Sequence, residues 1–308
     1  MADFFSCLGY VNTAAQDNPT IEFFPPKGDG NAVSLPWLSE TLPVNLYALT
    51  WMLPSGKLFM QANRSTILYD WHKDSYTYLA DMPYAVRVYP ASAATAMMPL
   101  TPANNYTATI LFCGGSNPPQ WGDDGSSRYN VTAIPADNTC VRISPDAANP
   151  KYEDDDFLHQ GRSMGSFAYL PDGTLWLGNG VAMGTAGYGD DMWSVGESYG
   201  QAPIYTPGLY DPSKPKGYRW SFDLAASTEE RMYHSTVVLL ADGSLMISGS
   251  NVSLTTFCAQ WLLLTLCALS SPTRTTRPLN GARNTLLNGG THLGSTRNDP
   301  VPLGSLRR

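Results

Sequence analysis

The chain has 308 residues and a formal net charge of −7, with 15% charged residues, 27 glycines and 24 prolines. Acidic residues outnumber basic ones, and no basic patch with interleaved aromatic residues occurs, which argues against nucleic acid as a partner. The 17 tyrosines and 8 tryptophans favour β-structure, and no segment shows a sustained helical period.

The first residues, 1–8, contain no basic stretch and only a short apolar run, so we expect no secretory signal there. Three N-glycosylation acceptor sequences are nevertheless typical of an extracellular protein: Asn63-Arg64-Ser65, Asn105-Tyr106-Thr107 and Asn130-Val131-Thr132. Because such sequences also arise by chance, the sequence alone leaves surface glycosylation open.

The body of the chain repeats one unit, in which an apolar run leads through a tight bend to a second apolar run. The bends contain Ser-Gly or Asp-Gly, and glycine accepts the positive φ that a hairpin turn requires. Four such units recur at intervals of about 50–70 residues, close to or above the length of a kelch blade. They span residues 46–62, 94–115 (with a longer bend), 165–178 and 235–250. We therefore predict an all-β fold, an antiparallel β-propeller represented by about four blades.

Two of the five cysteines flank predicted strands. Cys113 ends the unit at 94–115, and Cys140 precedes another apolar run. We predict a disulfide between them because the acceptor sequences indicate an oxidising compartment, and two buried free thiols are the alternative. No Cys-x-x-Cys pattern occurs, which argues against a structural zinc site.

The composition changes abruptly near residue 251. Residues 252–308 hold one acidic residue, Asp299, and six basic residues, all of them arginine. We therefore predict a partial propeller domain over 1–251 and a non-homologous, disordered and irregular tail over 252–308. The uncharged, apolar stretch 252–271 approaches the length of a membrane-spanning helix, so a membrane anchor is the less favoured alternative.

Tyr233 and His234 stand side by side at the entrance of the last hairpin, and His234 is the histidine with a second potential metal ligand beside it. The other histidines are expected in less informative places. His72 is expected in an exposed turn, His159 in a polar connection and His292 in the tail.

Three further patterns match functional motifs only in part. Gly161-Arg162-Ser163-Met164-Gly165 matches a hydrolase nucleophile motif, with Ser163 as nucleophile and His234 as base, but that motif needs a following helix and a strand is predicted. The glycines of 178–184 lead into an expected loop at 185–190 rather than a phosphate-binding helix. The acidic run Glu153–Asp156 lacks the spacing of a calcium loop, and we expect it to be solvated.

The run Arg231-Met232-Tyr233-His234-Ser235, followed by Leu240-Ala241-Asp242-Gly243-Ser244, resembles the glyoxal oxidase branch of the copper radical oxidases, relatives of galactose oxidase. The resemblance covers roughly residues 9–251. Further stretches are similar to family sequences, at residues 81–92, 99–106, 161–166 and 179–189.

The resemblance implies a seven-bladed kelch-type propeller with one copper ion on its axis. It implies that His234 is an equatorial ligand and Tyr233 the axial ligand and general base. Both donor types suit Cu(II). The family oxidises aldehydes or alcohols with dioxygen and releases hydrogen peroxide, so the implied partners are a small aldehyde and dioxygen. The resemblance also implies secretion.

The family's cysteine-linked radical tyrosine belongs to sequence before the resembling region, and its second histidine ligand belongs to sequence after it. Neither Tyr10 with Cys7 nor His292 stands in a matching motif. We therefore expect a chain truncated at both ends that is inactive by itself. The alternative is a non-catalytic propeller that serves as a binding scaffold.

Overall fold

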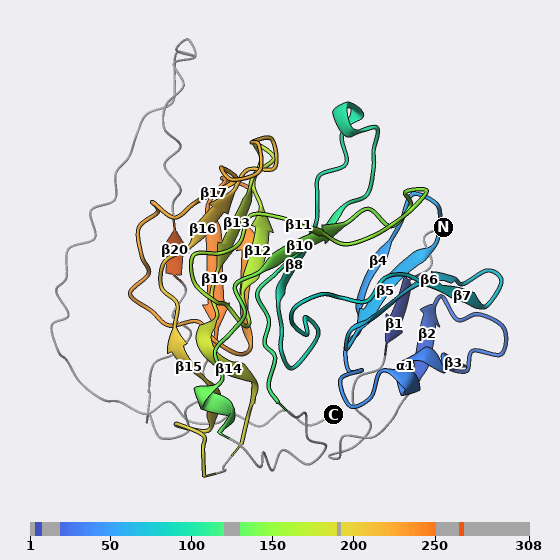
Figure 1. Cartoon of the computed structure of the whole chain (residues 1–308), viewed down its shortest axis with the longest axis horizontal. Coiled ribbons are helices and arrows are strands. Elements are labelled where there is room, and N and C mark those ends of the chain that lie inside the picture. The colour runs from blue at the N-terminus through green and yellow to red at the C-terminus, as the bar shows by residue number, and fades with distance from the viewer. Residues whose placement is uncertain (1–3, 8–18, 120–129, 190–191, 251–264, 268–308) are drawn as a thin grey trace, which may run out of the picture. The chain divides into compact units, whose positions relative to one another are not determined.

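The computed structural model describes residues 4–7, 19–119, 130–189, 192–250 and 265–267. Antiparallel strands dominate this part of the chain (Figure 1). Its helical elements are short: α1 (Trp37–Glu40) and the 3₁₀ turns η1 (Pro102–Asn104) and η2 (Val131–Ala133). The all-β prediction is therefore confirmed.

The strands form five sheets that follow one another along the chain, here called sheets I to V. Sheet I holds β1 (Phe4–Cys7), β2 (Thr20–Phe24) and β3 (Val33–Ser34). Sheet II holds β4 (Leu49–Met52), β5 (Leu58–Ala62), β6 (Ser65–Asp70) and β7 (Ser75–Tyr78). Sheet III holds β8 (Ala94–Met97), β9 (Ile110–Cys113), β10 (Cys140–Ile143) and β11 (Glu153–Asp154). Sheet IV holds β12 (Ser166–Tyr169), β13 (Leu175–Gly178), β16 (Gly208–Tyr210) and β17 (Trp220–Ser221). Sheet V holds β18 (Ser235–Leu239), β19 (Leu245–Gly249) and β20 (Thr265–Cys267).

The four predicted hairpins are confirmed as the first two strands of sheets II to V. Three of their bends carry glycines with a left-handed backbone, Gly56, Gly173 and Gly243, at φ values of 79°, 87° and 84°. This conformation carries no steric penalty for glycine, so the local sequence determines where the chain turns back. The number of blades and the kelch-type ring remain predictions.

Neighbouring sheets pack face to face because successive side chains on a strand point to opposite faces. On β9, Ile110 and Phe112 pack with Phe59 of sheet II, whereas Leu111 packs with Leu177 of sheet IV. All four β9 residues are consequently buried. Each such apolar side chain contributes about 1.5–3 kcal/mol when removed from water.

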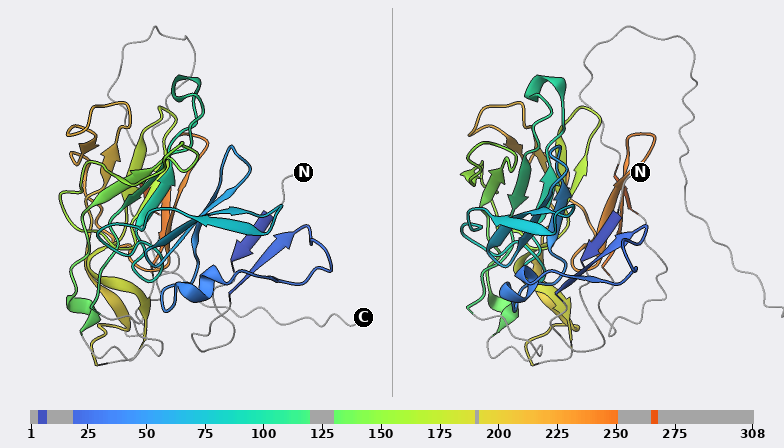
Figure 2. Two further views of the ribbon diagram at one scale, coloured as in Figure 1. Left: turned by 45° about the vertical axis from the view of Figure 1, so that its right-hand side comes forward. Right: turned by 90° about the vertical axis from the view of Figure 1, so that its right-hand side faces the viewer.

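A sixth sheet interrupts sheet IV. It is the hairpin of β14 (Val181–Tyr188) and β15 (Ser198–Pro203), which Figures 1 and 2 show in yellow-green, apart from the strands of sheet IV. The prediction of a loop over 185–190 is therefore wrong for residues 185–188, which belong to β14. A Cβ on Gly184 would lie 2.0 Å from the Tyr199 carbonyl oxygen, so glycine lets the two strands approach closely.

The prediction of a solvated loop for the acidic run is corrected in part. Glu153 and Asp154 are exposed but form the strand β11, whereas Asp155 is buried, at 2% exposed. Asp155 accepts hydrogen bonds from Tyr210 Oη at 2.9 Å and Arg219 Nη1 at 2.7 Å. Burying a carboxylate costs free energy unless the charge is paired. Through these two hydrogen bonds, Asp155 connects the end of sheet III to sheet IV.

The predicted disulfide is confirmed. Cys113 and Cys140 lie directly opposite each other on β9 and β10, with their sulfurs 2.04 Å and their Cα atoms 4.2 Å apart. Both side chains are fully buried. The alternative of two free thiols is therefore wrong.

The predicted tail lies largely outside the described residues, as does His292. One part of it, β20, pairs with β19, and the boundary at residue 251 stays a prediction. Among the residues that the structure describes, no helix has the length and apolar character needed to cross a membrane. The stretch 252–271 is outside that search apart from β20.

Candidate metal centre

Tyr233 and His234 occupy the middle of a tight turn immediately before β18. Ser235 closes this turn, since its backbone N–H and its Oγ both donate to the Met232 carbonyl oxygen, at 3.3 and 2.7 Å. His234 has a left-handed backbone with φ 61°. That conformation costs a residue other than glycine about 1–2 kcal/mol. Such backbone strain occurs at functional sites, but twelve other non-glycine residues of the described ranges share a positive φ, so the strain alone does not single out this turn.

The strained turn is held by the ends of two sheets. Arg231 Nη1 donates to the Gly249 carbonyl oxygen at 2.6 Å, and the Arg231 carbonyl oxygen accepts from Gly180 N at 2.6 Å. A Cβ on Gly249 would lie 2.2 Å from the His234 carbonyl oxygen. Glycine at this position therefore lets the end of β19 support the backbone of His234 directly.

The two rings stack on each other and belong to a larger group of aromatic side chains, here called the tyrosine cluster. The ring centroids of Tyr233 and His234 are 3.8 Å apart, with planes inclined by 25°. Tyr188, at the end of β14, lies 5.8 Å from Tyr233 and 5.7 Å from His234. Tyr89 lies 6.2 Å from Tyr233 and 5.5 Å from Tyr47. Tyr47, Tyr188 and His234 are exposed, so solvent and small molecules reach the cluster.

The cluster forms where equivalent positions of four sheets meet. A residue with positive φ stands one or two positions before the first strand of sheets II to V: Tyr47, Ser92, Met164 and His234, with φ values of 55°, 49°, 60° and 61°. Met164 N donates to the Ser92 carbonyl oxygen at 2.6 Å, and the Met164 side chain packs with Tyr89 and Tyr233. The repeated unit therefore brings the same local feature of successive sheets to one place.

Sequence reasoning identified Tyr233 and His234 but missed Tyr47, Tyr89 and Tyr188. These residues come from three separate segments with no common motif. One sequence feature could have identified Tyr47: it precedes the first apolar run of its repeated unit, as His234 does in the last unit.

The structure does not support a nucleophilic role for Ser163. Its side chain is fully buried, and its Oγ donates to the Ala91 carbonyl oxygen at 2.8 Å. The strand β12 follows it, where a nucleophile motif needs a helix. Gly180 likewise leads into β14, so no helix N-terminus is present there to bind a phosphate.

His72 and His159, the other histidines in the described part of the chain, lie where they were expected. His72 is exposed in the turn between β6 and β7 and stacks on Trp71, with centroids 3.6 Å apart. His159 is exposed in the connection after β11 and packs edge-on against Phe222. Partial desolvation and the nearby positive charge of Arg162 lower the pKa of His159.

Comparison with known proteins identifies the family. The model of the glyoxal oxidase N-terminus matches residues 11–260. The chain belongs to this glyoxal oxidase family. Aldehyde oxidase GLOX of Vitis pseudoreticulata is 34% identical over 240 residues, covering 75% of this chain and 42% of that protein. Aldehyde oxidase GLOX1 of Arabidopsis thaliana is 28% identical over 255 residues, covering 79% of this chain and 39% of that protein.

This member of the glyoxal oxidase family spans less than half the length of the curated relatives that it matches. Among solved structures, it is similar to a fungal alcohol oxidase of the AA5 family in complex with copper, with 15% identity and a TM-score of 0.43. That match covers 81% of this chain and 56% of the other. It is also similar to YjhT, with 12% identity and a TM-score of 0.45, over 75% of this chain and 68% of the other.

The donors in this glyoxal oxidase family chain fit copper in kind but not in number. A phenol oxygen and an imidazole nitrogen are suitable Cu(II) ligands, and Tyr233 and His234 supply one of each. Across the described ranges, however, no group of three or more His, Cys, Asp or Glu side chains gathers in a way that could hold a metal ion. The described residues therefore provide part of a tetragonal site, and we derive no catalytic step through copper.

Proposed function

We propose that residues 1–251 are part of a copper radical oxidase that oxidises aldehydes. In the overall reaction, an aldehyde, water and dioxygen give a carboxylic acid and hydrogen peroxide. An alcohol and dioxygen would give an aldehyde and hydrogen peroxide. The observation that carries this proposal is the stacked pair of Tyr233 and His234, a phenol and an imidazole held at a doubly anchored turn in an exposed tyrosine cluster. Family membership and the names of the relatives support it.

Within this proposal, Tyr233 and His234 would each supply one ligand to copper, and Tyr233 would serve as the general base toward the substrate. A phenol bound to a metal ion loses its proton more readily than a free one, which suits it to this role. Bound copper would supply one-electron redox chemistry. The reaction removes two electrons from the substrate, so a second one-electron store is needed. The resemblance assigns that store to a cysteine-linked tyrosine with no matching motif in this chain.

We therefore infer that the 308-residue chain does not turn over by itself. We also infer that the protein works outside the cell. The buried Cys113–Cys140 disulfide supports this location, because disulfides persist in oxidising compartments.

Copper titration tests the proposed ligands. We expect the wild-type chain to bind one equivalent of Cu(II). Tyr233→Phe should change the visible and electron paramagnetic resonance spectra of bound copper, and His234→Ala should weaken binding about tenfold or more because it removes a ligand. The matched control is Tyr218→Phe, since Tyr218 is 72% exposed and lies outside the tyrosine cluster. Spectra and affinities that are the same in all three variants would contradict the site.

Peroxide release tests the proposed inactivity. We expect the copper-loaded chain, given methylglyoxal and dioxygen, to release hydrogen peroxide at the background rate of free copper. Turnover above that background that disappears in Tyr233→Phe would overturn the proposed inactivity and leave the oxidase proposal standing.

The small number of donors favours the binding scaffold as the second candidate function. A chain that folds but binds no Cu(II) at Tyr233 and His234 would support it. The exposed rings of Tyr47 and Tyr188 would then be the surface to test for a ligand.

A further inference from the structure

The loop between β8 and β9 presents the glycosylation acceptor sequence Asn105-Tyr106-Thr107. Its turn η1 is held by a capping box, in which Asn104 N donates to Thr101 Oγ1 at 3.3 Å and Thr101 N donates to Asn104 Oδ1 at 3.0 Å. Asn105 follows η1 with a left-handed backbone, at φ 52° and ψ 37°. Figures 1 and 2 show this loop, in teal, projecting beyond the strands of sheet III.

All three residues of this acceptor sequence are accessible. Asn105, Tyr106 and Thr107 are each exposed. The side chain of Asn105 makes no hydrogen bond to any residue in the described part of the chain, and its own contact is the backbone bond from its N–H to the Pro102 carbonyl oxygen. Asparagine tolerates the left-handed region well, so the loop needs no rearrangement to carry a sugar.

The acceptor sequence at Asn63 is engaged in the fold. Asn63 is half-buried in the turn between β5 and β6, and its Nδ2 donates to the Thr41 carbonyl oxygen at 3.3 Å. The hydroxyl of Ser65 accepts a hydrogen bond at 2.8 Å from Nε1 of Trp37, a fully buried side chain. A glycan on Asn63 would be placed against this packed region. Asn63 Nδ2 and Ser65 Oγ thus both make contacts in this structure, and a glycan on Asn63 would disrupt the contact with Thr41.

The acceptor sequence at Asn130 is also partly inaccessible. Asn130 is half-buried, and its Oδ1 accepts from Thr132 Oγ1 at 2.7 Å. Val131, between them, is buried at the start of η2. The three residues are therefore held close to the body of the protein.

We propose that Asn105 carries an N-linked glycan and that Asn63 and Asn130 remain unmodified in the folded protein. The loop follows the end of β8 that is remote from Ser92, and Ser92 lies with the tyrosine cluster. A glycan on Asn105 therefore leaves the candidate metal centre open. It covers the exposed side chains of Leu100 and Tyr106. The proposal rests on the proposed extracellular location.

Secretion of the full chain behind an added leader peptide, from a cell that performs N-glycosylation, tests the site separately from the natural location. Enzymatic deglycosylation in heavy-oxygen water followed by peptide mass mapping reports each asparagine individually. We expect the label at Asn105 and none at Asn63 or Asn130. A fourth acceptor sequence, Asn251-Val252-Ser253, lies outside the described residues and is distinguished by its own peptide.

Matched variants test whether the label at Asn105 depends on its acceptor sequence. Asn105→Gln and Thr107→Ala should each remove one glycan mass, whereas Thr107→Ser should retain it. As a positive control, the added leader carries an acceptor sequence of its own. If that control sequence is fully glycosylated while Asn105 of the secreted chain is unmodified, the proposal is overturned. A glycan on Asn63 in folded chain would overturn its selectivity. Both results would leave the oxidase proposal untouched, because the leader supplies the route of secretion.

Discussion

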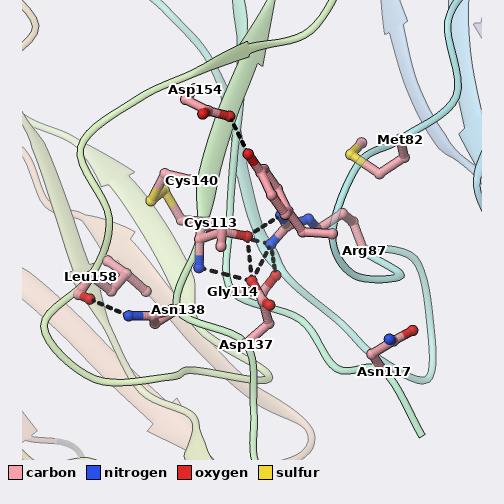
Figure 3. Close-up of polar contacts among 12 residues, drawn as sticks. Met82, Arg87, Cys113, Gly114, Asn117, Asp137, Asn138, Cys140, Asp154 and Leu158 are labelled. Atoms are coloured by element: carbon pink, nitrogen blue, oxygen red, sulfur yellow. Dashed lines mark hydrogen bonds and ion pairs between the residues drawn. A yellow bond between two sulfur atoms is a disulfide. The ribbon is translucent and has the colours of Figure 1, made fainter. Parts of the chain in front are cut away.

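Replacing Arg87 with methionine is expected to lower the free energy of unfolding by about 3–5 kcal/mol. The guanidinium is 0% exposed and is surrounded by acceptors, as Figure 3 shows. It donates to the carbonyl oxygens of Gly114 and Thr139 and to Thr139 Oγ1, and it lies 3.3 Å from Asp137 Oδ1. Methionine fills similar space but removes the charged donor from these buried acceptors. Among the described residues, the Thr139 carbonyl oxygen then keeps only the Gly114 N–H, and Asp137 Oδ1 keeps only the N–H and hydroxyl of Thr139.

Burial also lowers the pKa of Arg87, to about 10, because the charged form loses its hydration. The side chain therefore still carries its charge at neutral pH. Denaturation by guanidinium chloride, followed by tryptophan fluorescence, measures the loss of stability. Arg142→Met is the control, since Arg142, on β10, is an arginine whose side chain is 32% exposed. Equal losses of unfolding free energy in the two variants would contradict the claim that the buried hydrogen bonds of Arg87 stabilise the fold.

Removing the disulfide is expected to have the next largest effect. The variant with both Cys113→Ala and Cys140→Ala should lose about 3 kcal/mol, because the bond closes a loop with a sequence separation of 27 residues in the unfolded chain. Equilibrium unfolding without reductant measures this loss. Reductant should destabilise the wild type but leave the double variant unchanged. An equal response of the two proteins to reductant would show that the bond does not stabilise the fold.

These two effects are coupled through the chain. Cys113 directly precedes Gly114, and Cys140 directly follows Thr139. The disulfide therefore joins β9 and β10 beside the two carbonyl oxygens that accept hydrogen bonds from Arg87. Mutations in contact with a common network are not additive. A double-mutant cycle between Arg87→Met and the cysteine replacements should therefore give a free energy different from the sum of the separate losses.

Local sequence was sufficient to predict the hairpins and the disulfide. The bends at Gly56, Gly173 and Gly243 depend on residues next to one another in the chain, so their positions were readable. The pairing of Cys113 with Cys140 followed from the strands that each residue flanks. The Tyr233–His234 pair was found because the two candidate ligands are adjacent in sequence.

Buried charges were not predictable because their partners are distant in sequence. Arg162 is 1% exposed and donates to the carbonyl oxygens of Asn179 and Thr206 at 2.6 and 2.9 Å. The sequence shows such a residue only as charged, which favours a surface position. The same reasoning misplaced Asp155, whose hydrogen-bond donors Tyr210 and Arg219 follow it by more than 50 residues. The tyrosine cluster escaped prediction in the same way, because only the folded chain brings its members together.

The two ends of sheets II to V differ in how much change they accommodate. The bend of sheet III, between Met97 and Ile110, is much longer than the bend at Gly173, yet Ser92 keeps its place beside Met164. The length of a hairpin bend can thus change without displacing the residues that precede the first strand of the sheet. Such a molecule can evolve new outer loops, or accept an inserted affinity tag at a tip, without moving the side chains of the tyrosine cluster.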